Sequence, residues 1–281
     1  MLQVRNLEKV FHGRKGRVHA LTPTTFDIAQ GEFVCLVGAS GCGKSTLLNM
    51  IAGLEEPTAG EISLDGKPII GPGKDRGMVF QNYTLFPWLT VLENTEFSEQ
   101  LGCNLDYDTL TSADVEKRSG RAESLLEVMG LGDFHHSLPR ELSGGMKQRV
   151  AIARALVTQP KLLLMDEPFG ALDAQTREDM QEMMLLLSKT EGISVLFVTH
   201  DLEEAVYLAS RILVFSPRPG RLVADLKVPY LIERPATLKV HPDFLAIKRE
   251  LVDMLEASKS PGQKWDREAL LSKITREAAK P

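Results

Sequence analysis

The stretch GEFVCLVGASGCGKSTLL, residues 31–48, contains the pattern that decides the fold. An apolar run over 31–38 predicts a buried strand, and a helical run is expected over 46–52. Between them, residues 38–45 match G-x-x-x-x-G-K-[ST] at every position. Glycines allow successive backbone N–H groups to point at one anion, and the start of the following helix adds a partial positive charge. The sequence therefore predicts a phosphate-binding loop.

This loop brings two kinds of side chain to a bound nucleotide. Lys44 supplies a cation for the outer phosphates, and Ser45 offers a hydroxyl to Mg²⁺. The alternative is a chance match in a glycine-rich turn, and the strand–loop–helix context argues against it. The predicted nucleotide-binding residues of the loop are Gly38, Ala39, Ser40, Gly41, Cys42, Gly43, Lys44, Ser45 and Thr46.

A second motif, LLLMDE at residues 162–167, ends a predicted buried strand with two carboxylates. Open α/β sheets bind ligands at the carboxyl ends of their strands. We expect Asp166 to hold the Mg²⁺ ion and Glu167 to orient and deprotonate the attacking water. The alternative is a pair of solvated surface acids, which the four apolar residues before them make less plausible.

Strands and helices alternate along most of the chain, which predicts a mainly parallel sheet. We expect an α/β fold, with a P-loop NTPase (RecA-like) core, an N-terminal antiparallel β subdomain and an inserted α-helical subdomain. The ATP-binding core is predicted to comprise residues 1–82 and 155–234. The helical subdomain spans 83–154, and a helical tail follows over 235–281.

Composition excludes several other classes of protein. The chain has 281 residues, of which 43% are hydrophobic and 25% charged, so a disordered or collagen-like chain is excluded. A net charge of −5 gives no support to nucleic-acid binding. The longest apolar runs are strand-sized, and no signal core or membrane span is expected. Cys35, Cys42 and Cys103 form no CxxC pair, which favours a reduced, cytosolic compartment.

Three further positions are ambiguous when each is taken alone. Gln81 ends a predicted strand, where its amide could reach Mg²⁺ and the attacking water or could simply face solvent. His200 ends ISVLFVTH, where its imidazole could touch the γ-phosphate or serve as a structural hydrogen-bonding group. The stretch LSGGMKQR, residues 142–149, begins a helix with Ser143 and two glycines. It is either an ordinary glycine-rich helix start or a second anion site for a nucleotide carried by a partner subunit.

Taken together and in this order, these motifs resemble the ATP-binding cassette (ABC) family over residues 1 to about 230. The resemblance implies that LSGGMKQR is the family signature, with Met146 where many members have Gln. It implies catalytic roles for Glu167, His200 and Gln81. The Mg²⁺ ligands it implies are Ser45, Gln81 and Asp166. The signature residues implied to meet the ATP of the other subunit are Ser143, Gly144, Gly145 and Gln148.

Two other residues take expected roles from the same resemblance. Asp173 lies in the D-loop, the stretch Ala171-Leu172-Asp173. Phe11 occupies the place of an aromatic ring that stacks on adenine, although it could equally belong to the core. In the family, two such chains close head to tail around two ATP molecules. Charge on the γ-phosphoryl group is then stabilised by Lys44, Mg²⁺ and the backbone amides of the signature.

The family resemblance implies a transport function through a separate permease. GPGKDRGMVFQNYTLFPWLTVLENTEF (71–97), MDEPFGALDAQTR (165–177) and PDFLAIKREL (242–251) look like the ATPase subunits of nitrate, sulfonate, taurine and bicarbonate importers. The expected partners are a second ATPase subunit, either identical or a paralogue, the permease, and indirectly an extracytoplasmic substrate-binding protein. The expected place is the cytoplasmic face of the inner membrane, as a peripheral subunit. The alternative is a soluble ABC ATPase acting on nucleic acid or ribosomes.

Three segments allow more than one interpretation. Leu85, Phe86, Trp88 and Leu89 either line a docking groove for a short permease helix or pack in the core. The polar segment 101–120 is favoured as a surface loop, with contact to a partner as the alternative. The tail contains helical stretches, DFLAIKRELVDMLEAS and DREALLSKITREA. In the first of them, the predicted residues that pack on the core are Leu245, Val252 and Leu255.

Overall fold

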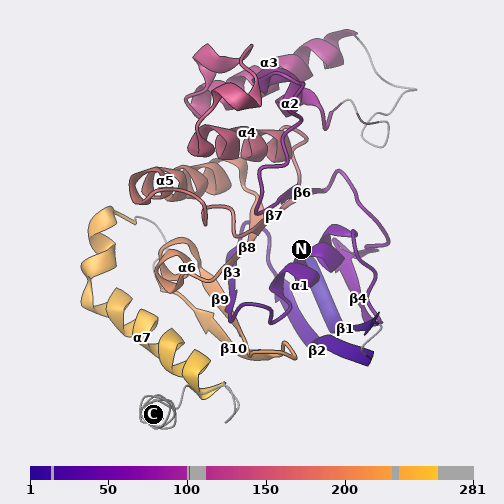
Figure 1. Ribbon diagram of the computed structural model, residues 1–281, viewed down its shortest axis with the longest axis vertical. Helices are drawn as coiled ribbons and strands as arrows, with labels where there is room; N and C mark the ends of the chain where they lie inside the picture. Colours follow the sequence, from indigo (N-terminus) through magenta and orange to yellow (C-terminus); the bar gives the residue numbers. More distant parts are fainter. Residues whose placement is uncertain (14–15, 100, 102–111, 230–233, 259–281) are drawn as a thin grey trace, which may run out of the picture.

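Figure 1 shows the computed structural model, which describes residues 1–13, 16–99, 101, 112–229 and 234–258. A four-stranded antiparallel sheet lies beside a six-stranded sheet, and a group of helices caps one end of the molecule. This arrangement confirms the predicted α/β fold with an antiparallel N-terminal part and a helical insertion. Within those ranges, no helix is both long and apolar enough to cross a membrane.

The antiparallel sheet is built from the first strands of the chain. Its hairpin turn at Asp65 and Gly66 has positive φ at both residues, 50° and 76°, as a tight two-residue turn requires. The residues on either side of this turn pair antiparallel, so a β-hairpin forms here. The strand order is β2 (Gly16–Ile28), β1 (Leu2–Gly13), β4 (Ala59–Leu64) and β5 (Lys67–Pro68).

The six-stranded sheet is parallel except for one edge strand. That edge strand pairs antiparallel with its neighbour. Because the other strands run the same way, their carboxyl ends meet at one edge of the sheet. The order is β10 (Leu222–Lys227), β9 (Arg211–Phe215), β3 (Phe33–Gly38), β8 (Ser194–Thr199), β7 (Leu162–Asp166) and β6 (Arg76–Val79).

The central strand β3 is buried on both faces, which explains its unbroken apolar sequence. Alternate side chains of a strand point to opposite faces. One face packs with α1 (Lys44–Ala52) and the antiparallel sheet, and the other packs under the remaining helices. The first core receives Val34 and Leu36, and the second receives Phe33, Cys35 and Val37. Cys35 and Cys42 are buried free thiols, while Cys103 lies outside the described residues.

The helices of the insertion lie together at the top of Figure 1. They are α2 (Val91–Glu96), α3 (Ser112–Val128) and α4 (Gly144–Leu156), and two short 3₁₀ turns connect the last two. Thr90 caps α2 with a reciprocal capping box, in which the Thr90 hydroxyl and the Glu93 carboxylate each accept a backbone N–H of the other residue. Three-dimensional packing of α4 against both α2 and α3 holds this group together.

The structure corrects part of the expectation for 101–120. A surface loop is predicted there, but helix α3 already begins at Ser112. The sequence from 113 to 118 contains Ala, Glu, Lys and Arg, which favour helices, although its polarity resembles that of a loop. Residues 102–111 lie outside the described part of the chain, so a partner contact there stays a prediction.

The helices of the second half pack into the same core as the insertion, on the face of the six-stranded sheet opposite α1. They are α5 (Ala174–Glu191), α6 (Leu202–Leu208), the 3₁₀ helix η4 (Ala236–Val240) and α7 (Pro242–Ala257). Helix α7 packs against α6, β9 and η4, which confirms that the first tail helix packs on the core. The second predicted tail helix, within 259–281, lies outside the described residues.

The buried face of α7 differs from the predicted one. Leu245 and Val252 are exposed, and Leu255 is partly buried against the core. Phe244 and Leu251, each one position earlier, are completely buried instead. Because each helical residue turns the side chain by about 100°, a shift of one position rotates the contact face. The apolar residues of α7 are spread widely enough for either face to be buried. The surface formed by α6, β9 and η4 decides which face packs inward.

Candidate functional site

The phosphate-binding loop joins β3 to α1 by a left-handed turn. Gly43 forms the N-cap of α1 with φ of 97°, a conformation that favours glycine. A Cβ at Gly43 would lie 2.6 Å from the carbonyl oxygen of Ala20, so the position also lacks room for one. Helix α1 begins at Lys44, slightly before the expected start at Thr46. The loop therefore presents its backbone to the start of a helix, as the sequence predicts.

The ammonium of Lys44 is enclosed by the loop, and the residue is only 5% exposed. Its Nζ donates to the carbonyl oxygens of Gly38 at 2.8 Å and Ala39 at 3.1 Å. Among the described residues, no acidic side chain forms an ion pair with Lys44. A buried cation held by neutral carbonyls keeps its charge available to an anion in the loop.

The two carboxylates after β7 occupy different environments. Asp166 is largely buried, and this desolvation raises the pKa of its carboxyl group despite an opposing hydrogen bond from the Ser45 hydroxyl. Its Oδ1 is buried and has no hydrogen-bond partner among the described residues. A carboxylate oxygen left in this way beside a hydroxyl fits a hard cation such as Mg²⁺.

Glu167 turns the chain at the end of the strand. Its φ of 45° lies in the left-handed region, and its N–H donates to the carbonyl oxygen of Val198 on the neighbouring strand at 2.9 Å. This bend separates its side chain from that of Asp166. A non-glycine residue held in such a conformation is often part of a functional site.

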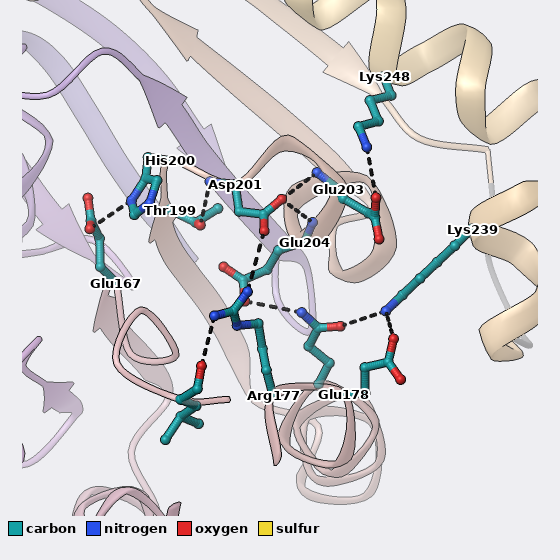
Figure 2. Close-up of polar contacts among 12 residues, drawn as sticks. Glu167, Arg177, Glu178, Thr199, His200, Asp201, Glu203, Glu204, Lys239 and Lys248 are labelled. Atoms are coloured by element: carbon teal, nitrogen blue, oxygen red, sulfur yellow. Dashed lines mark hydrogen bonds and ion pairs between the residues drawn. The ribbon is translucent and has the colours of Figure 1, made fainter. Parts of the chain in front are cut away.

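Glu167 and His200 come from adjacent strand ends and contact each other (Figure 2). His200 Nδ1 lies 2.9 Å from Glu167 Oε2. The imidazole is 64% exposed and the carboxylate 22% exposed, so both groups remain open to a ligand. The parallel pairing of β7 with β8 places the ends of the two strands together. The structure therefore brings these two predicted catalytic residues into direct contact.

Gln81 and Phe11 are both accessible at the surface. Gln81 follows the end of β6 at Val79 and is exposed, with no hydrogen bond to Lys44 or Glu167. Phe11 lies on β1 and is 39% exposed, with the Lys9 ammonium 5.0 Å from its ring centroid. The alternative that places Phe11 in the core is therefore wrong. Stacking on adenine stays a prediction for this exposed ring.

The signature motif begins α4 at an exposed position. Ser143 is the N-cap, and its hydroxyl accepts the N–H of Met146 at 3.3 Å. Ser143 and Gly144 are exposed, whereas Gly145 is buried. A Cβ at Gly145 would lie 2.5 Å from Cγ2 of Thr176, so α4 approaches the first turn of α5 closely here.

Gln148 does not fit the role that the family resemblance implies for it. Its side chain is completely buried, so it does not face a second subunit in this structure. Both of its amide atoms lack a hydrogen-bond partner among the described residues. Its place one turn into α4 puts it on the face that packs inward, while the preceding Ser143 lies at the exposed end.

Asp173 has a clear local structural role. It is the N-cap of α5, and it accepts hydrogen bonds from the backbone N–H of Thr176 at 3.1 Å and from the Thr176 hydroxyl at 2.7 Å. These hydrogen bonds lower the pKa of its carboxyl group. The residue is exposed, and so it can also meet a partner.

Sequence reasoning missed three charged residues beside the Glu167–His200 pair. Arg177, Asp201 and Glu204 line the same small cavity, of about 50 Å³, as the pair itself. The stretch 165–177 ends at Arg177, but nothing in its pattern indicates that this charge points inward. Glu204 follows a polar helix start and reads as a surface acid, yet it is buried.

A larger cavity of about 490 Å³ lies between the sheet and the helical insertion. Phe86 lines it and packs on Phe97 at 4.3 Å between ring centroids, with the Arg154 guanidinium over the Phe86 ring. Trp88 is 71% exposed, whereas Leu85 packs partly against the core. The four apolar residues after Gln81 therefore do not share one environment.

The comparisons with known proteins agree on one family. The family model described as ABC transporter matches residues 21–170. A nitrate import ATP-binding protein of Synechocystis sp. is 49% identical over 90% of this chain and 94% of its own length. A taurine import ATP-binding protein of Rhizobium johnstonii is 44% identical over 92% of this chain and 97% of its own. A dimeric ATP-binding cassette, solved in a post-hydrolysis state with ADP and Pi, has a TM-score of 0.70 and 32% identity over 82% of this chain and all of that one.

Proposed function

Since this chain belongs to the ABC transporter family and is an ATPase coupled to transport, we propose that it powers import of a small anion by a bacterial transporter. Nitrate, a sulfonate such as taurine, and bicarbonate are the candidate solutes. The nitrate and taurine import relatives support this class, because each aligns with at least nine-tenths of this chain. In this proposal the permease and a binding protein select the solute, and the ATPase subunit supplies the energy.

ATP hydrolysis would use the edge where the parallel strands end. The loop from Gly38 to Thr46 would cradle the phosphates, with Lys44 neutralising their charge. Ser45 and Asp166, with Gln81, would hold Mg²⁺, which when bound supplies further charge neutralisation. The buried Oδ1 of Asp166, which has no hydrogen-bond partner within the described part of the chain, supports this ligand set.

Glu167 is the proposed general base. Its carboxylate would accept a proton from the attacking water, while His200 keeps the carboxylate oriented and contacts the γ-phosphate. The observation that carries this assignment is the 2.9 Å contact between His200 Nδ1 and Glu167 Oε2 at the strand ends. General base catalysis needs a carboxylate within hydrogen-bond reach of the water proton, and an orienting neighbour such as His200 would hold Glu167 in place for this.

The active state would be a dimer with two composite sites. Ser143 and the glycines after it are proposed to approach the ATP held by the loop of a second subunit, identical or paralogous. Exposure of Ser143 and Gly144 at the start of α4 supports this role. The buried Gln148 is not part of the proposed contact. We propose the helical segment 83–154 as the part of each subunit that carries the signature.

The cavity beside Phe86 is the proposed docking place for a short permease helix. Its aromatic lining and the neighbouring Arg154 fit an amphipathic helix with an apolar anchor. Docking there would place the subunit peripherally at the cytoplasmic face of the membrane. No nucleic-acid partner is proposed.

The experiment that tests the function is reconstitution. The tagged chain is purified with its co-expressed permease from detergent-solubilised membranes and placed in proteoliposomes with its binding protein. We expect uptake of labelled nitrate, taurine or bicarbonate that depends on MgATP and is lost in the Glu167→Gln variant. Isolation of the chain as a dimer bound to nucleic acid or ribosomes, with no permease, would support the soluble alternative.

A further inference from the structure

Arg177 lies one turn into α5 (Figure 2). It stands between two loops that are far apart in the sequence, the D-loop and the turn that follows β8. Its Nη2 donates to the carbonyl oxygen of Leu172 at 2.8 Å. Its Nη1 lies 3.9 Å from Asp201 Oδ2. Leu172 belongs to the D-loop, and Asp201 follows His200 directly. One guanidinium therefore joins the D-loop to the turn that carries His200.

Asp201 is well suited to transmit this contact. Its Oδ1 accepts the N–H groups of Glu203 at 2.9 Å and Glu204 at 3.3 Å, which caps α6. Its own N–H donates to the Thr199 hydroxyl at 3.0 Å. The peptide segment from Thr199 to the first turn of α6 is thus held by the carboxylate and the backbone N–H of one residue, Asp201. Any displacement of Asp201 would also displace His200.

A buried carboxylate holds the other side of this turn. Glu204 accepts a hydrogen bond from Nε2 of Gln181 on α5 at 3.2 Å. Burial raises the pKa of Glu204, while hydrogen bonds from Thr199 and Gln181 oppose that shift. Helix α5 therefore contacts the turn at two points. Gln181 bonds to the buried Glu204, and Arg177 faces Asp201 nearer the surface.

We propose that Arg177 is a positioning residue for hydrolysis, which ties the D-loop to the Glu167–His200 pair. Arg177, Asp201, His200 and Glu167 line one cavity, so a shift of the guanidinium acts where the pair lies. An arginine suits this place because one guanidinium nitrogen can donate to the Leu172 carbonyl while the other faces the Asp201 carboxylate, whereas lysine is a point charge. Closure of two subunits against the exposed D-loop would in this way set the geometry of the base. The inference rests on the proposed function of Glu167 and His200.

The first test measures steady-state ATP hydrolysis by the purified full chain. Arg177→Ala should lower kcat about tenfold and leave KM for ATP within about twofold, because geometry at the base changes while the phosphate loop does not. Arg177→Lys should recover part of kcat, since it keeps the charge but not the fork. Thermal unfolding of both variants separates lost positioning from lost folding. Arg249→Ala, on the exposed face of α7, is the matched control and should leave kcat unchanged.

A double-mutant cycle tests the path through Asp201. Asp201→Asn keeps an efficient N-cap for α6 but removes the charge that faces Arg177. If Arg177 acts through Asp201, the double variant should lose no more kcat than Arg177→Ala alone. Additive losses would contradict this path, and a rise in KM at constant kcat would assign Arg177 to nucleotide binding instead.

Failure of this proposal can be told apart from failure of the proposed function. If Glu167→Gln abolishes turnover while folded Arg177→Ala and Arg177→Lys hydrolyse ATP like the parent chain, only the role of Arg177 is overturned. If Glu167→Gln keeps normal turnover, the assignment of the base is wrong whatever the Arg177 variants do.

Discussion

The chain contains two glycine-rich helix N-termini, those of α1 and α4. They differ in how far residues of the same chain enclose them. At α1, the Lys44 ammonium is buried and bonded to two carbonyls of its own loop. At α4, Ser143 and Gly144 are exposed, and within the described residues a side chain caps only the first-turn N–H of Met146. Both starts offer backbone N–H groups to an anion. The first is enclosed by its own chain, whereas the second faces outward.

This difference agrees with the two roles proposed for these helix N-termini, the phosphate loop at α1 and the contact to a partner's nucleotide at α4. Enclosure gives α1 a preformed cradle that one subunit can use alone. In the proposed dimer, exposure leaves α4 free to meet the nucleotide of a partner, and among the described residues no side chain other than that of Ser143 caps its first turn. Changes at α1 should therefore alter ATP binding by the single chain, and changes at α4 should alter only what requires two chains.

Glu167→Gln should have the largest effect. It should leave a stable dimer in which each ATP lies between the start of α1 in one subunit and the start of α4 in the other. The amide cannot accept a proton from water, so turnover should fall about 1,000-fold. ATP binding should persist, because Lys44 and the loop are unchanged. Phosphate release measures the first effect, and size-exclusion chromatography with MgATP should show a stable dimer. A chain that binds MgATP and stays monomeric would break the comparison of the two starts.

Ser143→Arg should stop hydrolysis without changing ATP affinity of the single chain. A bulky cation at the exposed start of α4 would displace the backbone donors from a partner's ATP, with a loss of about 100-fold in turnover. Ser124→Arg, on an exposed site of α3, is the matched control and should retain turnover. Turnover equal to that of the parent in Ser143→Arg would remove α4 from the composite site.

Lys44→Ala should weaken ATP binding itself. Loss of a charge-assisted contact to phosphate corresponds to about tenfold or more in Kd. Isothermal titration of the single chain with ATP measures this directly, and Lys189→Ala at the exposed end of α5 serves as the control. Unchanged affinity in Lys44→Ala would mean that the start of α1, like that of α4, does not bind ATP in the single chain.

The smallest expected effect separates the two starts by stability alone. Gly43→Ala should lower the free energy of unfolding by about 1–3 kcal/mol, because its φ is positive and a Cβ would meet the Ala20 carbonyl. Gly144→Ala should change it by less than about 0.5 kcal/mol, since the nearest atom is the Tyr83 hydroxyl at 3.0 Å, the end of a flexible side chain. Urea denaturation of both variants gives the comparison, and equal losses would contradict it.

Much of the fold could be predicted because its signals are local. The unbroken apolar run of β3, the loop after it and the hairpin at Asp65 each depend on neighbours in sequence. The pairing of β9 with β10 was predictable for the same reason, since a short turn joins them. Strand-end acids such as Asp166 and Glu167 were predictable as site residues because parallel strands bring their ends to one edge.

Other features depend on contacts between distant segments and were not predictable. The apolar positions of α7 allowed two adjacent faces, and the surface it meets selected the one with Phe244 and Leu251. The inward position of Gln148 follows from where α4 packs. Arg177 reads as an exposed charge on a polar helix, and only the approach of α5 to the turn after β8 gives it Asp201 as a neighbour.

The sequence alone determined the phosphate loop, the strand-end carboxylates, the family resemblance and the order of the main elements. These rest on short-range backbone chemistry: which residues permit a left-handed turn, begin a helix or fill a buried strand. The tertiary structure alone decided which side chains meet, such as His200 with Glu167 and Arg177 with Asp201. Those contacts join residues far apart in sequence, so they exist only after the sheet and its covering helices have packed together.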